Sequence, residues 1–292
     1  MKKGSYVGAL TRQTRRGEGN LEQASEPSFE ADEGYVEFCE EIWYRWLDDK
    51  LSVSDFVRGV FDFNAAPEPY ISFGSGSKRL VALTTNPGKT MSHQTRAAVE
   101  TGNGPLRKQF KYAEAAPKLG EYYETHLPGP AWRRIAKLQK LASWTGHEGV
   151  LQVEACPFHS KSLPQKNTLL RQIAKDDLLR QYTKLLRAFL LDRPVVCVQA
   201  AATQASLRWE TPNSFEWLTW LADIAGIDLN RTEFVPLVKK DSKTTAAAWV
   251  SKETVGKALV LMMGSNNLPA DRGLSELSMA LGNSEQSARA SV

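Results

Sequence analysis

The sequence has no apolar run long enough to cross a membrane. Its longest such run is Ala258 to Met263, whereas a membrane-spanning helix needs about 20 predominantly apolar residues. The first residues, in which Lys2 and Lys3 precede a short and polar stretch, do not resemble a secretory signal. We therefore expect a cytoplasmic protein that has no membrane partner.

Cysteine is scarce, and so are the motifs of common cofactor sites. Cys39, Cys156 and Cys197 lie far apart, with no Cys-x-x-Cys pair and no histidine at metal-ligand spacing. Four cysteine ligands for an iron-sulfur cluster are not available. We expect three buried thiols, no metal and no cofactor. A glycine-rich phosphate loop is also missing, so a nucleotide-binding protein ranks last among the alternatives.

The chain has little excess charge, but the charge that it has is unevenly distributed. The 37 Lys and Arg residues against 33 Asp and Glu give a net charge of +4. Residues 104–147 hold eight basic residues against three Glu, and residues 231–257 hold six against three acidic ones. Two basic segments suit a polyanionic partner such as DNA, although solvated helix faces would produce the same pattern.

Hydrophobic periodicity predicts one α/β domain over residues 34–282, between a disordered arm at 1–33 and a disordered tail at 283–292. Residues 89–130, rich in Gly, Pro and charge, suit a long surface excursion with short helices, and 239–248 are ambiguous. The alternation of elements predicts a three-layer αβα sandwich with a mainly parallel central sheet. The expected helices are 35–47, a short one from Ser54, 131–144, 166–192 with a break near Asp176, 214–225 and 271–282; the expected strands are 67–73, 80–83, 150–155, 193–198, 234–238 and 257–263.

The chain is organised around the strand at residues 80–83 and the turn that follows it. Four apolar residues in a row suit a strand buried on both faces of a parallel sheet. Thr85-Asn86-Pro87-Gly88 comes directly after it. Ligands of open α/β sheets bind outside the carboxyl ends of strands, so Asn86 is well placed for chemistry. The alternative is an ordinary turn, since Asn, Pro and Gly are common turn residues.

Two further strands are followed by polar loops. Glu154 to Lys161 comes after the strand at 150–155, and Ser265 to Leu268 comes after the strand at 257–263. If these strands are parallel, all three loops meet at one edge of the sheet. We expect the functional site there.

This arrangement resembles the uracil-DNA glycosylase superfamily in its order of elements from residue 67 to 282. Thr85-Asn86-Pro87-Gly88 is similar to the Asn-Pro-Gly first motif of the branch that acts on mismatched uracil and thymine. Leu268 falls where that family inserts a wedge residue into DNA. The second motif departs from the family, because Gly264-Ser265-Asn266 stands in place of His-Pro-Ser or Asn-Pro-Ser.

The chemistry of such an enzyme can be matched to individual residues. Hydrolysis of an N-glycosidic bond requires an extruded base, a pocket that reads its edge and a positioned water. The Asn86 carboxamide can hold that water without acting as a strong base. We expect Asn86, His159 and Asn266 in catalytic roles. The expected base pocket comprises Thr85, Pro87, Gly88, Glu154, Phe158 and Ser160, and the expected DNA contacts are Lys161, Lys166, Arg133, Arg134, Asn267 and Leu268.

Several of these residues have an ordinary structural alternative. Glu154 could read the exocyclic amine of cytosine or pair with a basic residue of the core. Phe158 could stack on the base or pack in the core. His159 and Ser160 could donate to the base or a phosphate, or form an unremarkable loop. Asn266 and Asn267 could contact DNA or cap the next helix.

The leading hypothesis is a monomeric, monofunctional DNA glycosylase that releases a modified pyrimidine and leaves an abasic site. In the fast uracil-specific branch of the family, a bulky aromatic side chain excludes pyrimidines substituted at C5, and Gly88 lacks one. That favours a C5-modified base such as the glucosylated hydroxymethylcytosine of phage DNA, and a role in antiviral defence. The alternatives are a repair glycosylase for uracil or mismatched thymine, and a DNA-binding module without activity.

Overall fold

The computed structural model of the protein describes residues 29–126, 129–160, 162–201, 216–240, 243–254, 256–263 and 268–289. Residues 1–28 of the expected arm at 1–33, and the last three residues of the chain, lie outside these ranges. The helices are α1 (Phe29–Leu47), α2 (Asp55–Val60), α3 (Arg96–Thr101), α4 (Tyr112–His126), α5 (Gly129–Trp144), α6 (Lys166–Ile173), α7 (Asp177–Leu190), α8 (Glu216–Ala225) and α9 (Asp271–Arg289). The strands are β1 (Tyr70–Phe73), β2 (Arg79–Thr84), β3 (Gly149–Glu154), β4 (Val195–Ala201), β5 (Thr232–Lys240), β6 (Lys243–Ser251) and β7 (Lys257–Met263).

The strands form one mixed sheet in the order β1-β3-β2-β4-β7-β6-β5. Its four central strands, β3, β2, β4 and β7, pair in parallel. β2 and β3 end together, since Thr84 is paired with Glu154. The parallel centre that the sequence predicted is therefore confirmed, and the loops after these strands leave from one edge.

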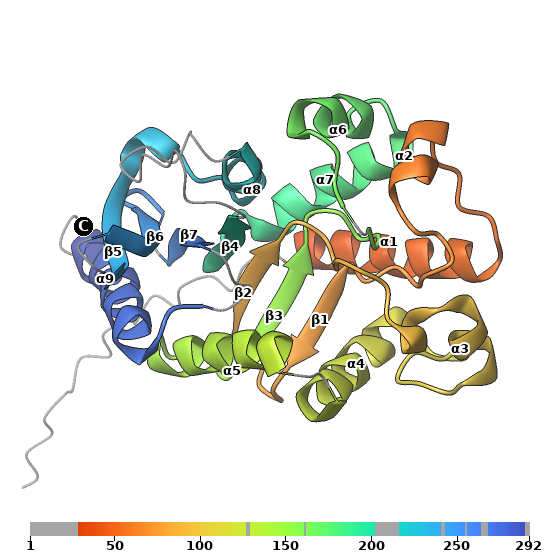
Figure 1. Cartoon of the computed structure of the whole chain (residues 1–292), viewed down its shortest axis with the longest axis horizontal. Coiled ribbons are helices and arrows are strands. Elements are labelled where there is room, and N and C mark those ends of the chain that lie inside the picture. The colour runs from red at the N-terminus through yellow and green to blue at the C-terminus, as the bar shows by residue number, and fades with distance from the viewer. Residues whose placement is uncertain are drawn as a thin grey trace, which may run out of the picture.

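Helices cover both faces of the sheet (Figure 1). α1, α7 and α8 pack together on one face, whereas α5 and α9 contact each other and the opposite face. The apolar runs of the central strands follow from this double covering, because alternate side chains meet a helix layer on either side. Among the described residues no helix is long and apolar enough to span a membrane. The layers match the predicted αβα arrangement.

The edges of the sheet differ most from the prediction. β1 is the expected edge strand and runs antiparallel to β3. β6 occupies the ambiguous segment and pairs with both β5 and β7. Its alanines gave the sequence no strong strand signal, but they are buried between the neighbouring strands and helices.

Two helices are longer than expected, and the segment at 89–130, where only short helices were expected, contains a helix of 15 residues. α4 lies inside the expected surface excursion and contains Pro117 and Gly120. Gly120 packs on the edge strand, where a Cβ would clash with the carbonyl oxygen of Ser72. α1 begins at Phe29, and α9 passes Gly282 to reach Arg289, so both helices enter segments that we expected to be disordered.

The three cysteines are free and buried, as predicted. Cys39 packs in α1, Cys156 follows β3, and Cys197 lies in β4 beneath α8, with its Sγ 3.8 Å from the carbonyl oxygen of Leu221. Burial raises the pKa of the Cys156 thiol to about 12. None of the three is therefore a thiolate at neutral pH.

Asp176 separates α6 from α7 at the predicted break. Its Oδ1 accepts a hydrogen bond from the backbone N of Leu179 at 3.1 Å, which caps α7, and its Oδ2 accepts one from the backbone N of Ser54 at 2.7 Å. Because Ser54 in turn caps α2, one carboxylate joins the starts of two helices.

The Asp176→Ala variant is expected to lower the free energy of unfolding by about 1–3 kcal/mol, since it removes a cap and leaves a second backbone N–H unpaired. Urea denaturation followed by circular dichroism measures the loss. Asp177→Ala is the matched control, because the neighbouring carboxylate is 87% exposed and forms a surface ion pair with Arg180. Equal losses in the two variants would contradict the role of Asp176.

Candidate functional site

The loop after β2 holds Asn86 at the carboxyl edge of the sheet. Gly88 adopts a φ of 81°, in the left-handed region that glycine favours, and so turns the chain away from the strand. Nδ2 of Asn86 donates a hydrogen bond to the carbonyl oxygen of Phe158 at 3.4 Å. The Oδ1 of Asn86 therefore remains to accept a hydrogen bond, and the residue is only partly buried.

The loop after β3 runs alongside the first loop and is tied to it by backbone hydrogen bonds. Ala155 N donates to Thr84 O at 2.8 Å, and Cys156 N donates to Thr85 O at 3.0 Å. Ser160 N donates to Gly88 O at 2.9 Å. The parallel pairing of β2 and β3 thus continues into the loops, and it fixes Asn86 beside Phe158, His159 and Ser160.

His159 is fully buried next to the carboxylate of Glu68. Its Nε2 lies 3.6 Å from Oε1 of Glu68, an ion-pair distance. Burial lowers the pKa of His159, but the charge and hydrogen bonding of Glu68, together with the charge of Glu154 and the backbone of Gly88, leave the pKa above its ordinary value of 6.5. The protonated imidazole is thus favoured in the folded protein.

Glu68 belongs to a buried hydrogen-bond network that also includes Gln94 and Tyr123. Nε2 of Gln94 donates to Oε1 of Glu68 at 2.5 Å, and the hydroxyl of Tyr123 donates to the same oxygen at 3.0 Å. Gln94 comes from the segment before α3 and Tyr123 from α4, so the excursion between β2 and β3 closes over this edge of the sheet. The network holds the carboxylate in place beneath His159.

Glu154, the last residue of β3, is also buried. Its Oε2 accepts a hydrogen bond from Thr84 at 2.5 Å, and its Oε1 accepts one from Gln152 at 2.7 Å. Burial raises the pKa of Glu154, opposed by these hydrogen bonds and by the positive charge of Arg134. The structure thus brings Glu154 near a basic residue of the core, which was one of its two predicted roles.

Several buried polar atoms at this edge of the sheet have no hydrogen-bond partner among the described residues. They are the Nδ1 of His159, the Oγ of Ser160 and the Nε2 of His93, whereas the Nε2 of His159 faces Glu68 at ion-pair distance. Buried polar atoms are nearly always paired with protein or water, so unpaired ones mark a place for a missing partner. Three such atoms at one edge of the sheet indicate a site that a polar ligand completes.

The remaining predicted residues have diverse positions. Phe158 packs against Phe63, with ring centroids 4.7 Å apart, so it belongs to the core in this structure. Thr85 and Pro87 flank Asn86 and are partly buried. Lys166 Nζ donates to Thr219 Oγ1 at 2.7 Å and so links α6 to α8. Lys161, Asn266 and Asn267 lie outside the described residues.

Two of the predicted DNA contacts do not fit the structure. Leu268 is 1% exposed and packs in the hydrophobic core, whereas a wedge residue has to project from the surface. Arg134 points inward from α5, with its Nε buried, and interacts electrostatically with Glu154. Arg133, its neighbour on α5, is exposed instead. Successive residues point in different directions around a helix, so these two arginines, both predicted to contact DNA, have different environments.

Sequence reasoning missed Glu68, His93, Gln94 and Tyr123. One signal was present for Glu68, which stands between Pro67 and Pro69 just before the edge strand. Because β1 runs antiparallel to β3, its start lies at the edge where β3 ends. The residue before an antiparallel edge strand is thus a candidate for the site. His93, Gln94 and Tyr123 lie in a segment whose sequence shows no clear hydrophobic periodicity.

No metal centre is evident: within the described ranges no three His, Cys, Asp or Glu side chains are grouped so that they could hold an ion. This edge includes two buried carboxylates, Glu68 and Glu154, with His159 and Arg134 beside them. Such an arrangement can position a water and stabilise negative charge on a departing group.

Comparisons of the chain with protein-family models, with curated proteins and with solved structures gave no match, so its function is argued from the residues of this site.

Proposed function

We propose that the protein is a monofunctional DNA glycosylase of the uracil-DNA glycosylase type, with Asn86 as the residue that positions the hydrolytic water. The observation that carries the proposal is the orientation of the Asn86 carboxamide at the carboxyl edge of β2. Since Nδ2 donates to the carbonyl oxygen of Phe158, Oδ1 is available to accept a proton of the water.

The reaction requires little more than positioning and charge stabilisation. The water oxygen bonds to C1′ of the sugar, the C1′–N1 bond breaks with its electron pair passing to the base, and the proton of the water passes to the base or to solvent. The transition state resembles an oxocarbenium ion, so a neutral amide suffices to orient the water. A protonated His159 stabilises the negative charge that develops on the base as it leaves.

The unpaired polar atoms support recognition of a base edge. The Nδ1 of His159, the hydroxyl of Ser160 and the Nε2 of His93 would find partners on an extruded pyrimidine. Ser160 and His93 are each less than a tenth exposed in this conformation. A flipped base would therefore enter as the loops open around Asn86, as in enzymes whose sites tighten only when the substrate is bound.

Gly88 supports a substrate substituted at C5. No atom lies within 4 Å of the point where a Cβ would stand on Gly88. Gly88 therefore contributes no wall to the space beside Asn86, and the positive φ of Gly88 disfavours any side chain at this position. We infer a C5-modified cytosine, such as glucosylated hydroxymethylcytosine of phage DNA, as the favoured substrate and antiviral defence as the role. Uracil and mismatched thymine, the substrates of a repair enzyme, would also enter such a site.

An abasic-site assay tests the proposal. The purified protein is incubated with oligonucleotides that carry uracil, mismatched thymine, hydroxymethylcytosine or its glucosylated form, in single and double strands, and alkali then cleaves any abasic site. Cleavage at one modified base is expected. If all strands stay intact while the protein binds the same oligonucleotides in a salt-dependent manner, the glycosylase hypothesis is rejected in favour of a DNA-binding module without activity.

The rate of base release is expected to fall as the pH rises through the raised pKa of His159, by about tenfold per pH unit above it, because only the imidazolium stabilises the leaving base. The ion pair of His159 with Glu68 also stabilises the folded protein. This stabilisation is fully present below the pKa of His159 in the unfolded chain, and it is lost as the pH rises through the higher pKa of His159 in the folded protein. Single-turnover rates across the pH range measure the effect. His159→Gln should remove this falling limb, and an unchanged profile in that variant would rule out His159 as the titrating group.

A further inference from the structure

The carboxylate of Glu68 is close to both histidines of the candidate site. Its Oε1 lies 3.6 Å from Nε2 of His159, in the loop after β3. The same oxygen accepts hydrogen bonds from Gln94, the residue next to His93, and from Tyr123, whose ring centroid is 5.6 Å from that of His93. One carboxylate therefore acts on two imidazoles.

The two imidazoles have different surroundings. His159 is fully buried and faces Glu68 at an ion-pair distance. His93 is also buried, but its ring packs against those of Tyr122 and Tyr123, with centroids 4.6 and 5.6 Å away. Within the described part of the chain His93 forms no ion pair. Burial without an ion pair favours a neutral imidazole, whereas a carboxylate beside the ring favours the imidazolium.

The other charges near the two rings strengthen this difference. Burial lowers the pKa of His93, and the charges of His159 and His126 lower it further, against the attraction of Glu68. Against the effect of burial, the pKa of His159 is raised by Glu68 and by Glu154. The charged and titratable groups come from all the neighbouring elements: Glu68 before β1, Glu154 at the end of β3, Tyr123 and His126 of α4, and Arg134 of α5, which acts on Glu154.

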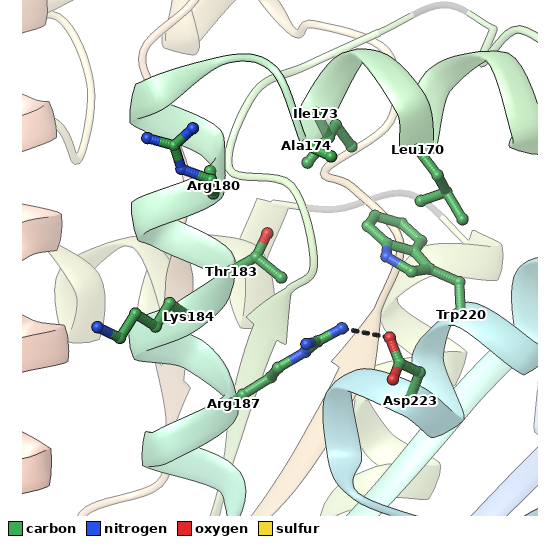
Figure 2. Close-up of a pocket in the computed structure, with 9 residues that line it drawn as sticks. All are labelled: Leu170, Ile173, Ala174, Arg180, Thr183, Lys184, Arg187, Trp220 and Asp223. Atoms are coloured by element: carbon green, nitrogen blue, oxygen red, sulfur yellow. Dashed lines mark hydrogen bonds and ion pairs between the residues drawn. The ribbon is translucent and has the colours of Figure 1, made fainter.

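Burial distinguishes the pair of Glu68 and His159 from ion pairs at the surface. In the groove between α6, α7 and α8, Arg187 is paired with Asp223, as Figure 2 shows, and both side chains are exposed. Water and salt screen such a pair, so each charge has little influence on the other. Screening is weak around Glu68 and His159, and the charge of one therefore controls the protonation of the other.

We propose, on the basis of the glycosylase reaction described above, that Glu68 is a positioning residue that holds a proton on His159 and leaves His93 neutral. The cationic His159 stabilises the negative charge that develops on the base as the C1′–N1 bond breaks. A neutral imidazole accepts a hydrogen bond as well as donating one, which an imidazolium cannot do. His93 therefore suits the amine at N4 of cytosine, and this division of charge favours a cytosine-type base.

NMR titration of the histidine rings tests the division of charge. The chain has four histidines, so His93→Gln and His159→Gln identify the two relevant signals in protein with ¹³C-labelled histidine. His159 is expected to titrate above the ordinary pKa of histidine and His93 below it. Equal values, or the reverse order, would overturn the proposal.

Glu68→Gln keeps the shape of the side chain and removes its charge. The pKa of His159 is expected to fall by about 1–3 pH units, the usual effect of a carboxylate at this distance. The pKa of His93 should change less, because the attraction of Glu68 and the repulsion of His159 are lost together. Asp223→Asn is the matched control, since it removes the carboxylate of the exposed pair in Figure 2 and should shift neither histidine. An unchanged titration of His159 in Glu68→Gln would overturn the role of Glu68.

The pH dependence of base release distinguishes a positioning role from a purely structural one. In Glu68→Gln the falling limb assigned to His159 is expected to move to lower pH by the same amount as the NMR titration. A limb at the wild-type position, with a rate lowered equally at every pH, would overturn the positioning role.

A second limb is expected at acid pH with a cytosine-type substrate, because His93 loses its acceptor when it gains a proton. His93→Gln, whose amide oxygen remains an acceptor, should remove this limb. Persistence of the acid limb in that variant would overturn the role of His93.

The titrations need no substrate, so this proposal and the glycosylase proposal can fail separately. If the abasic-site assay shows no base release while His159 and His93 titrate as expected, the glycosylase proposal alone falls. Thermal unfolding verifies that each variant is folded. If Glu68→Gln does not fold, Tyr123→Phe takes its place, since it removes one hydrogen bond to Glu68 and keeps the charge. A His159 pKa at or below its ordinary value in the wild type or in Tyr123→Phe would overturn the proposal.

Discussion

The Asn86→Ala variant is expected to lose base release by about 100- to 10,000-fold, because the change removes the group that orients the attacking water. Asn86 is partly buried in a surface loop, and its one hydrogen bond within the described structure is the 3.4 Å contact with Phe158. The substitution should therefore leave the fold and the DNA affinity almost unchanged. Single-turnover rates with saturating enzyme separate the chemical step from binding.

Asn230→Ala is the matched control for this experiment. Asn230 is exposed in the short 3-10 helix before β5, remote in sequence from every residue of the candidate site. A contaminating glycosylase would give the same activity in all preparations, so a loss in Asn86→Ala beside full activity in Asn230→Ala assigns the activity to this protein. Retention of the full rate in Asn86→Ala, with substrate still bound, would contradict the proposed role of Asn86.

The position of Asn86 could be predicted because it follows from local rules. A short apolar run predicts a strand buried on both faces, and Pro87 and Gly88 predict the turn after it. The pairing of Thr84 with Glu154 then brings the loop after β3 to the same place. These steps need only the order of the strands and their parallel direction, which the alternation of helices and strands indicates.

The partners of these residues could not be predicted in the same way. Glu68, Gln94 and Tyr123 lie in three different segments, and only the packing of α4 on the edge strand brings them together. α4 itself was hidden by Pro117 and Gly120, which lower helix propensity. Tertiary contacts outweigh that propensity here, since the small Gly120 permits close approach to β1.

Two side chains that were expected at the surface are buried by tertiary packing. Leu268 follows a strand end, where the family resemblance implied an exposed wedge, yet it packs in the core. Arg134 belongs to a basic segment that suggested DNA contacts, yet its charge acts on Glu154. A sequence gives the number of charges in a segment, but the rotation of a helix about its axis decides which of them reach solvent.

Lys257 offers the largest expected effect on stability. It is 1% exposed at the start of β7, and its Nζ donates three hydrogen bonds to backbone carbonyl oxygens. The acceptors are Leu190 at 2.9 Å and Leu191 at 2.7 Å, at the end of α7, and Ala225 at 2.6 Å, at the end of α8. One ammonium thus satisfies the last carbonyls of two helices and lies at the negative ends of their dipoles.

Hydrogen bonds to the Lys257 ammonium compensate for the free-energy cost of burying its charge. Burial lowers its pKa from the ordinary value of 10.5, and the stated hydrogen bonds use all three of its N–H groups. Gly226, with a φ of 67°, ends α8 and turns the chain so that the carbonyl oxygen of Ala225 faces the ammonium. Removal of the ammonium would take a donor from all three carbonyl oxygens and leave that of Leu190 with only the backbone N of Arg193 at 3.4 Å.

Lys257→Met is therefore expected to lower the free energy of unfolding by about 3–5 kcal/mol, the usual cost when one partner of a buried charged network is removed. Whole domains are stable by only about 5–15 kcal/mol, so the loss should be visible as a large shift of the urea midpoint. Lys252→Met makes the same chemical change at an exposed position between β6 and β7 and should cost less than about 0.5 kcal/mol. If both variants unfold at the same urea concentration, the ammonium does not join α7 and α8 to the sheet. A selective loss would mean that a single buried lysine holds the ends of both helices against β7.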